Sequence, residues 1–385
     1  MQNMLIIALK DYRDSRKNRL FFVLLGFLLL LTITSIVLAS FDFRNKLAEY
    51  NQALQVLKNL GKVPDTSTPQ FFPLKMLRGV VDYLEIIGAI LGIILGYLSI
   101  AKEKGKNTLQ LLLSRPIGQY DIVSGKVLGN SALILSVLAV NALALYLILW
   151  FVGGVQFSTA ELVKLGLVFV ASYFYIMFFF CLTSILALKL KSLPNALIIG
   201  FTIWLAFVLI IPQIGDTMDP DNQIPGGFFK SMKMNHDQGK EILKKFKTYE
   251  TVRNTIEETS ITKHYERLSF ALLGIKDYYN NKTLGFIFHD KWFDGVWVAG
   301  FFLLALLAEY LVLARKEHIL HNGSSRDSPG TIESVILLCI IDLIAAKPGD
   351  SDHSRRTAGQ FGPILPDKKY MASALVACPS HRKVA

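Results

Sequence analysis

Few residues of this 385-residue sequence could do chemistry, and they form no catalytic set. Hydrolases that work inside a membrane need paired carboxylates, a Ser/His pair or metal ligands within their apolar segments. Here the ionisable residues within long apolar segments are Glu85 and Glu309, each near a segment end. Because Arg315 follows Glu309 by six residues, we expect Glu309 to reach the interface and pair with a basic neighbour. We therefore predict that the chain has no catalytic residue and is not an enzyme.

Two other patterns could bind ligands, and both are weak. Met232, Met234 and His236 are soft ligands at a spacing that suits copper, but the lysines beside them oppose a cation. The nearest string to a phosphate-binding loop ends in Gly125-Lys126-Val127, with six residues between its glycines and no Ser or Thr for magnesium. The prediction is therefore no metal and no cofactor on this chain, and no ATP hydrolysis by it.

The composition indicates an integral membrane protein. The sequence is 52% hydrophobic and 18% charged, whereas soluble domains carry about 25% charged residues. The apolar residues gather in blocks about 20 residues long, which is the length a helix needs to cross a bilayer. We predict an all-α protein with six spans, at about residues 20–40, 83–101, 127–152, 165–188, 194–212 and 295–314.

The formal net charge of +11 fits a membrane better than a nucleic acid. Its cations flank apolar spans, where they attract anionic lipid, and no nucleic-acid reading motif accompanies them. Lys and Arg number five before the first span and five in residues 102–126, but none in residues 153–161. The positive-inside rule therefore predicts that the N- and C-termini are cytoplasmic. We expect the chain to lie in the cell membrane and to have membrane lipids, but no nucleic acid, as partners.

The connecting segments divide the chain further. Residues 1–19 read as an amphipathic interfacial helix on the cytoplasmic side. Residues 41–82 and 215–294 are long outer loops; the first holds a helix near 47–60 before irregular chain, and the second an amphipathic helix near 240–266. The tail, 317–385, is too short in its apolar stretch to span and is expected to be a disordered extension of unknown role.

Gly88, Gly92 and Gly96 lie four residues apart in the second span. That spacing places them on one helical face and lets another helix approach closely. The neighbour is either another helix of the same subunit or, in a dimer or gate, a helix of a second subunit.

The loop 102–126 contains a short helix with an apolar face. Leu109, Leu112 and Leu113 share that face, and Arg115-Pro116 ends the helix because the residue before proline avoids the helical region. The segment is too short and too charged to cross the bilayer. Its apolar face either lies on the lipid surface or binds a partner protein.

This loop resembles the signature of type-two ABC exporter permeases. In that family a glutamate follows the second span, then come a Gly-Thr-Leu turn, a Leu-Leu-Ser-x-Pro helix and a Gly-Lys pair leading into the third span. The matching residues are Glu103, Thr108, Leu109, Leu112, Leu113, Ser114, Pro116, Gly125 and Lys126, with Arg115 at the variable position. Asn107 replaces the turn glycine, and asparagine tolerates the left-handed conformation better than other non-glycine residues. The resemblance covers residues 1–316 and is closest to the branch with large outer loops, which includes the nitrous-oxide reductase copper-maturation permease.

The resemblance implies a division of labour. A separate ATPase subunit would bind ATP and Mg, the loop helix would dock on that subunit, and Glu103 and Lys126 would lie where the loop leaves and re-enters the membrane. The working unit would hold two ATPases and two permeases, and the two permeases would form a homo- or heterodimer. The export pathway would lie between the permeases, lined by spans two and five. Two alternatives remain: a permease-like subunit that uses ATP for mechanical work on an outer partner, and a membrane scaffold without an ATPase.

Overall fold

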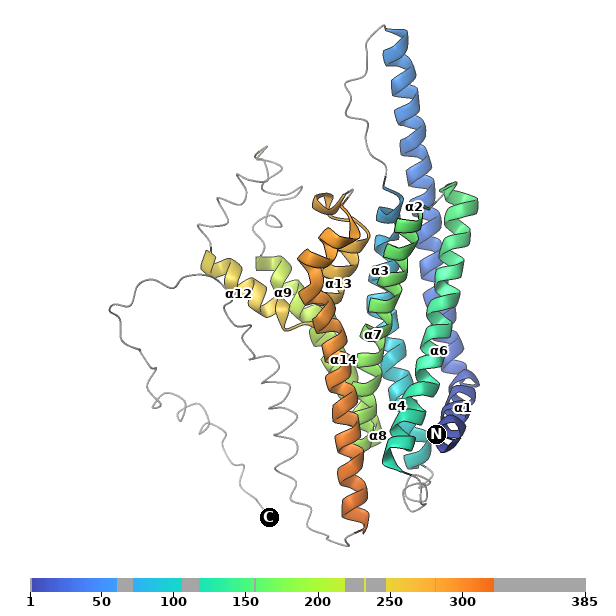
Figure 1. The fold of residues 1–385 in the computed structure, drawn as a ribbon, viewed down its shortest axis with the longest axis vertical. Coiled ribbons are helices and arrows are strands. Elements are labelled where there is room, and N and C mark those ends of the chain that lie inside the picture. The colour runs from blue at the N-terminus through green and yellow to red at the C-terminus, as the bar shows by residue number, and fades with distance from the viewer. Residues whose placement is uncertain are drawn as a thin grey trace, which may run out of the picture. The chain divides into compact units, whose positions relative to one another are not determined.

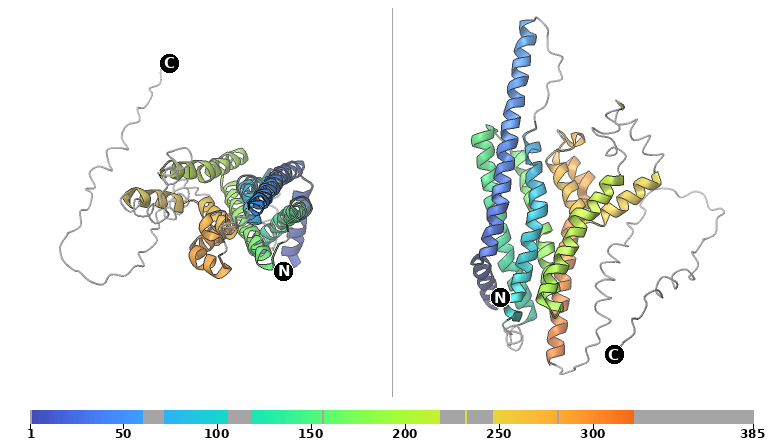
Figure 2. Two further views of the ribbon diagram at one scale, coloured as in Figure 1. Left: turned by 90° about the horizontal axis from the view of Figure 1, so that it is seen from above. Right: turned by 180° about the vertical axis from the view of Figure 1, so that it is seen from behind.

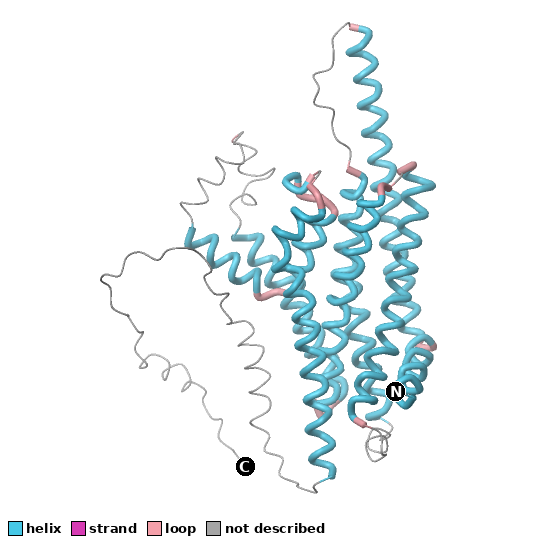
Figure 3. Tube along the Cα trace, in the orientation of Figure 1, coloured by secondary structure: helices cyan, strands magenta, loops and turns pink. Residues whose placement is uncertain are grey.

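The computed structural model describes residues 2–60, 72–105, 118–155, 157–218, 232, 247–280 and 282–321. All of them belong to the first of two compact units, Met1–Ser328. The described residues form helices joined by short connections, as Figure 3 shows. The predicted tail lies outside the described residues except for its first turn, which continues the last helix to His321.

Six helical stretches are long and apolar enough to cross a membrane: Arg19–Asn59, Pro73–Gly105, Tyr120–Gly153, Thr159–Lys189, Leu193–Gly215 and Leu284–Leu313. They confirm the predicted all-α membrane fold with six spans (Figure 1). The first is α2 (Arg19–Asn59), preceded by the N-terminal α1 (Gln2–Arg16). The second combines η1 (Pro73–Leu77), α3 (Arg78–Tyr83), the π-helix η2 (Leu84–Gly88) and α4 (Ala89–Gly105).

The third and fifth spans also contain π-helical turns. The third span is α6 (Gln119–Ile148) with η3 (Leu149–Gly153), and the fourth is α7 (Thr159–Lys189). The fifth joins α8 (Leu193–Leu205), η4 (Ala206–Ile210) and α9 (Ile211–Met218). After the helices α12 (Lys247–Glu258) and α13 (Ile261–Leu272) and the short η6 (Asp277–Tyr279), α14 (Leu284–His321) forms the sixth.

Helix α2 differs from the expectation of a span that ends near residue 40. Its 41 residues form one helix, about 60 Å long, which is twice the hydrocarbon thickness of a bilayer. No Gly or Pro interrupts residues 41–59, and Lys46 and Asp42 form an i, i+4 ion pair at 2.7 Å. Figure 1 shows this half of α2 projecting beyond the end of α6.

Helix α7 is the centre of the bundle and contacts α4, α14, α13, α8 and α6. It begins at a capping box in which Ser158 and Glu161 bond each other's backbone N–H groups. Its buried face includes Tyr175, Phe179 and Phe180, all of them inaccessible to solvent. The core of the protein is therefore built around the single helix α7.

The three glycines of the second span face α7 of the same chain. A Cβ atom on Gly92 would lie 2.5 Å from the Ile176 carbonyl oxygen, and one on Gly88 would lie 2.9 Å from Ile176 Cδ1. A Cβ atom on Gly96 would overlap the Phe180 carbonyl. The missing side chains let the α4 backbone pack directly against the α7 backbone.

The segment between the fifth and sixth spans holds two helices where one near 240–266 was expected, and residues 240–246 lie outside the described part. The break falls at Thr259 and Ser260, and the Ser260 hydroxyl donates to the Phe207 carbonyl in η4 at 2.9 Å. Helix α13 is buried against α7 and α14, with Tyr265 stacked on Tyr175 at 4.7 Å between ring centroids. The Tyr175 hydroxyl also donates to the Glu85 carbonyl in η2 at 3.0 Å, so the aromatic pair joins α13 to span two.

We predict that Gly96→Ala destabilises the bundle by about 1–3 kcal/mol, because its methyl group overlaps the α7 backbone. Thermal unfolding of the full chain in detergent measures this as a lower melting temperature. Gly166→Ala is the matched control, since a Cβ atom there meets nothing within 4 Å and the alanine favours the helix. Equal melting temperatures for the two variants would contradict the proposed close packing.

Candidate functional site

The two expected coupling residues that the structure describes, Glu103 and Lys126, lie at the two ends of the α4–α6 loop. The other expected coupling residues lie outside the described residues: Asn107, Thr108, Leu109, Leu112, Leu113, Ser114, Arg115 and Pro116. Glu103 is on the last turn of α4 and Lys126 is in the second turn of α6. Figures 1 and 2 show α1 beside these same helix ends.

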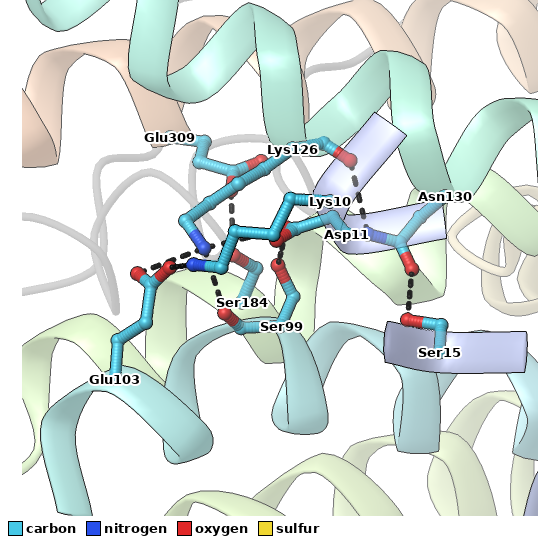
Figure 4. A network of polar contacts seen from close by, with 9 residues as sticks. All are labelled: Lys10, Asp11, Ser15, Ser99, Glu103, Lys126, Asn130, Ser184 and Glu309. Atoms are coloured by element: carbon cyan, nitrogen blue, oxygen red, sulfur yellow. Dashed lines mark hydrogen bonds and ion pairs between the residues drawn. The ribbon is translucent and has the colours of Figure 1, made fainter. Parts of the chain in front are cut away.

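Glu103 and Lys126 form a buried ion pair. Lys126 Nζ lies 2.9 Å from Glu103 Oε2, and the exposed fractions of the two residues are 2% and 6%. The other carboxylate oxygen of Glu103 accepts a hydrogen bond from Lys10 Nζ of α1 at 2.9 Å (Figure 4). One carboxylate therefore joins α1, α4 and α6.

Lys126 has two further partners. It donates to the Ser99 carbonyl of α4 at 2.8 Å and lies 3.4 Å from Asp11 Oδ2 of α1. The Ser99 hydroxyl donates to the same Asp11 oxygen at 3.4 Å. Two ammonium groups and two carboxylates thus converge, and opposite charges compensate each other around the buried Lys126, Glu103 and Asp11, whereas Lys10 stays half exposed.

The neutral part of this network fixes α1 along α6. The Asn130 amide donates to the Lys126 carbonyl at 3.0 Å and accepts the Ser15 hydroxyl at 3.0 Å. A Cβ atom on Gly125 would lie 2.8 Å from Ile7 Cβ, and one on Gly129 would overlap the Ala8 carbonyl. Helix α1 is therefore packed against protein along the face that these residues share.

Burial and charge act in opposite directions on the ionisable groups of α1. Burial raises the pKa of Asp11, which the positive charge of Lys126 partly offsets. Burial alone would lower the pKa of Lys10, but the hydrogen bond and negative charge of Glu103 outweigh it and raise that pKa. Since the folded-state pKa of Asp11 lies above the ordinary 3.8, its ionisation weakens folding as the pH rises through that interval. Lys10 and Lys126 are what make an ionised Asp11 tolerable at neutral pH.

The C-terminal end of α4 is also bonded to the C-terminal end of α7. Lys104 Nζ donates to the carbonyls of Ala187, at 3.0 Å, and Leu190 at the C-terminal end of α7. These are carbonyls that a helix end leaves without intrahelical partners. The end of α4 is therefore joined to α1, α6 and α7.

Sequence reasoning missed five members of the network: Lys10, Asp11, Ser15, Ser99 and Asn130. One signal was present, because Ile7, Asp11 and Ser15 recur every four residues and all three are buried. An aspartate on the apolar face of an interfacial helix predicts a buried cation as its partner. The pair Gly125 and Gly129, also four apart, was the second signal of a close helix contact.

The expectation for Glu309 was wrong. Its side chain is 1% exposed and its Oε1 accepts the Ser184 hydroxyl at 2.5 Å, so it faces α7 rather than the interface (Figure 4). The helix turn on which Glu309 lies packs inward because α14 runs along α7. Spacing from Arg315 could not reveal which face of α14 meets a neighbour.

The described residues contain no group of three His, Cys, Asp or Glu side chains that could hold a metal ion. Of the Met232, Met234 and His236 cluster, only Met232 lies among the described residues, and it is exposed.

Six helices of spanning length, with α7 as the central one, and a buried charge network at one end define a multi-pass membrane protein. The family model described as "ABC-2 family transporter protein" matches residues 5–317, and the chain belongs to this family. It is accordingly the permease component of an ABC transporter; permeases of this family work with an ATPase and in a dimeric arrangement. No curated protein matches the chain significantly.

We predict that Lys126→Met lowers the free energy of unfolding by about 3–5 kcal/mol, because it leaves Asp11 and Glu103 buried with a single cation between them. Lys10→Met removes the second cation of the same network, but that lysine is half exposed and the loss should stay below about 1 kcal/mol. Chemical denaturation in detergent compares the two variants. A Lys126 variant as stable as the Lys10 variant would show that the buried network does not hold the loop base.

Proposed function

We propose that this permease couples ATP hydrolysis on a separate subunit to export, through the loop 102–126. The observation that carries the proposal is the ion pair between Glu103 and Lys126, which fastens both ends of the loop to each other and to α1. A helix presented on such a base can transmit force, because the buried charges resist separation. The loop helix with Leu109, Leu112 and Leu113 would supply the surface that docks on the ATPase.

The contacts of α4 support a route for that force into the membrane. The loop base is bonded to the end of α7 through Lys104, and higher up α4 packs on α7 through Gly92 and Gly96. Movement of the loop would thus be passed to spans two, three and four together. Closely packed helices shift as bodies rather than deforming continuously.

The charges support a cytoplasmic location for the loop end of the bundle and a position in the cell membrane. Exposed cations gather where α1 meets α2 and at the end of α4: Arg13, Arg16, Lys17, Arg19 and Lys102. These would face anionic lipid headgroups on the cytoplasmic side. The outer end would then carry the α2 extension and helices α12 and α13, and these large outer parts favour the branch with large outer loops.

The fifth span supports a second permease as partner. In the most apolar stretch of this span, 17% is buried within the chain, which is the lowest share among the six spans; the corresponding share in α7 is 61%. Ile198, Leu205 and Leu209 on this span are exposed. We propose that this face meets the second permease and that the export pathway runs between the two.

For the coupling loop, we predict that the double variant Leu112→Glu, Leu113→Glu loses the ATPase on co-purification, with at least a tenfold decrease in bound ATPase. The reason is that removing the apolar contacts of both leucines should cost about 1.4 kcal/mol or more of binding free energy. The measurement is a mild-detergent pull-down of the full chain from its native membranes, with ATPase quantified by mass spectrometry. Leu111→Glu is the matched control, since a helical period places it opposite Leu112 and Leu113.

An intact complex in the double variant would contradict the loop assignment. Absence of any ATPase from the folded wild-type preparation would instead support the membrane scaffold. An ATPase recovered together with a large outer protein would favour mechanical work on that protein.

For the second permease, we predict that Ile198→Cys forms a disulfide between two copies in native membranes, if the partner is another copy of this chain. The other described cysteine, Cys181, is buried and should not compete. Leu143→Cys on the exposed face of α6 is the control, with a similar exposure of about three fifths. Non-reducing gels compare the two variants, and equal cross-linking of both would contradict a specific dimer face.

A further inference from the structure

Spans two and five each contain a π-helical turn with helix on both sides of it. Span two runs from α3 through η2 into α4, and span five runs from α8 through η4 into α9. The turn η3 differs, because the left-handed Gly154 after it ends the helix of span three. Helices bend at π-helical turns, where the regular hydrogen-bond ladder is interrupted. The turns η2 and η4 are therefore the places where spans two and five can change their bend.

In η4, a proline removes a backbone donor and a serine of α13 replaces it. The N–H of Ile211 bonds the Ala206 carbonyl, five residues earlier. The next bond of that series would join the Phe207 carbonyl to Pro212, which has no N–H. The Ser260 hydroxyl donates to the Phe207 carbonyl instead, at 2.9 Å. The bend of span five is thus stabilised by a side chain from another helix.

Ser260 makes this contact at the expense of its own helix. It is the N-cap residue of α13, a position where a serine hydroxyl ordinarily accepts a hydrogen bond from a backbone N–H of the first turn. The Ser260 side chain makes no such cap, because its hydroxyl is directed to span five. The contact with η4 therefore replaces a local interaction that would stabilise α13.

The first turn of α13 also reaches η2, through α7. The N–H of Ala89, which an α-helix would direct to the Glu85 carbonyl, bonds a carbonyl three residues earlier. The Tyr175 hydroxyl donates to the Glu85 carbonyl at 3.0 Å. A phenol has one hydrogen, so in the 3.3 Å contact between Tyr175 and Thr262 the threonine hydroxyl is the donor. Thr262 lies in the first turn of α13.

We propose that Ser260, Thr262 and Tyr175 form a bridge between the bends of spans two and five, so that a displacement of α13 changes both bends together. All three side chains are inaccessible to solvent. Water therefore does not replace a bond that is broken here, and breaking one leaves a buried polar group unsatisfied. The inference rests on the proposed function in one point, that spans two and five line the export pathway. The bridge would then set the shape of that pathway on the side away from the α4–α6 loop.

Hydrogen–deuterium exchange of the full chain in lipid nanodiscs, without an ATPase, tests the bridge. Ser260→Ala should speed amide exchange in residues 206–211 about fivefold, the effect of losing one net hydrogen bond. Exchange in residues 84–90 should also rise, although the Ser260 hydroxyl bonds span five and not span two. Because coupling between two sites is reciprocal, Tyr175→Phe should speed exchange in residues 206–211 as well.

Thr202→Val is the matched control. It also removes one hydroxyl from the contacts of span five, but this hydroxyl bonds a carbonyl of its own helix, that of Ile198, at 2.9 Å. The residue is exposed, so the loss stays local. Exchange in residues 84–90 of this variant should equal that of the wild type.

A second substitution separates the bridge from local repair of η4. Pro212→Ala, added to Ser260→Ala, supplies a backbone N–H for the Phe207 carbonyl. Residues 206–211 should regain their protection, while residues 84–90 should still exchange fast because the bridge remains cut. Wild-type exchange of residues 84–90 in Ser260→Ala would overturn the bridge, and so would recovery of both segments in the double variant. Neither an ATPase nor a second permease is needed, so these outcomes are independent of the pull-down that tests the coupling loop.

Discussion

The ammonium group of Lys126 is the contact on which the half of this permease next to the α4–α6 loop depends. It lies in an almost dry position at the start of the third span, where an unpaired charge would be very costly. Glu103, Asp11 and the Ser99 carbonyl surround it, so the cost is offset only when α1, α4 and α6 are all in place. A buried charge set of this kind adds little net stability, but it strongly penalises arrangements in which any of its helices is displaced.

That constraint gives the N-terminal helix a different role from the one its amphipathic pattern indicates. A helix with exposed Leu5, Ile6 and Leu9 can lie on lipid, and the opposite face of α1 is bonded to the bundle through Lys10, Asp11 and Ser15. The same helix therefore has an exposed apolar face on one side and is bonded on the other side to the helix ends that flank the α4–α6 loop. Any displacement of the loop must be accompanied by α1 or must break the ion pair between Lys10 and Glu103.

Different kinds of interaction position the two ends of the helix bundle around α7. Toward the loop, α7 receives the Lys104 ammonium at its last carbonyls; in its middle it meets backbone to backbone with α4 at Gly92 and Gly96. On the side away from the loop it contributes Tyr175, which stacks on Tyr265 and donates to a carbonyl of the π-helix η2. A π-helical turn leaves the regular hydrogen-bond ladder, so an added donor from a neighbouring helix stabilises it. Helix α7 is consequently the element through which both ends of span two are positioned.

The sequence by itself determined the elements that depend on local pattern: six apolar stretches of spanning length and a helix at the N-terminus. The residues of the loop 102–126 resembled the family to which the chain belongs. Such features can be predicted because hydrophobic length, periodicity and proline act within a few residues along the chain. The sequence did not determine that α2 continues to Asn59, or that the predicted amphipathic segment 240–266 breaks at Ser260, whose hydroxyl bonds a carbonyl of η4. Only the tertiary structure decided the partners of the polar residues, placing Glu309 against Ser184, Asp11 beside Lys126 and His264 between Asp294 and Glu258. The physical reason is that a local pattern tells which face of a helix is buried, whereas the group that compensates a buried charge comes from a helix far away in sequence.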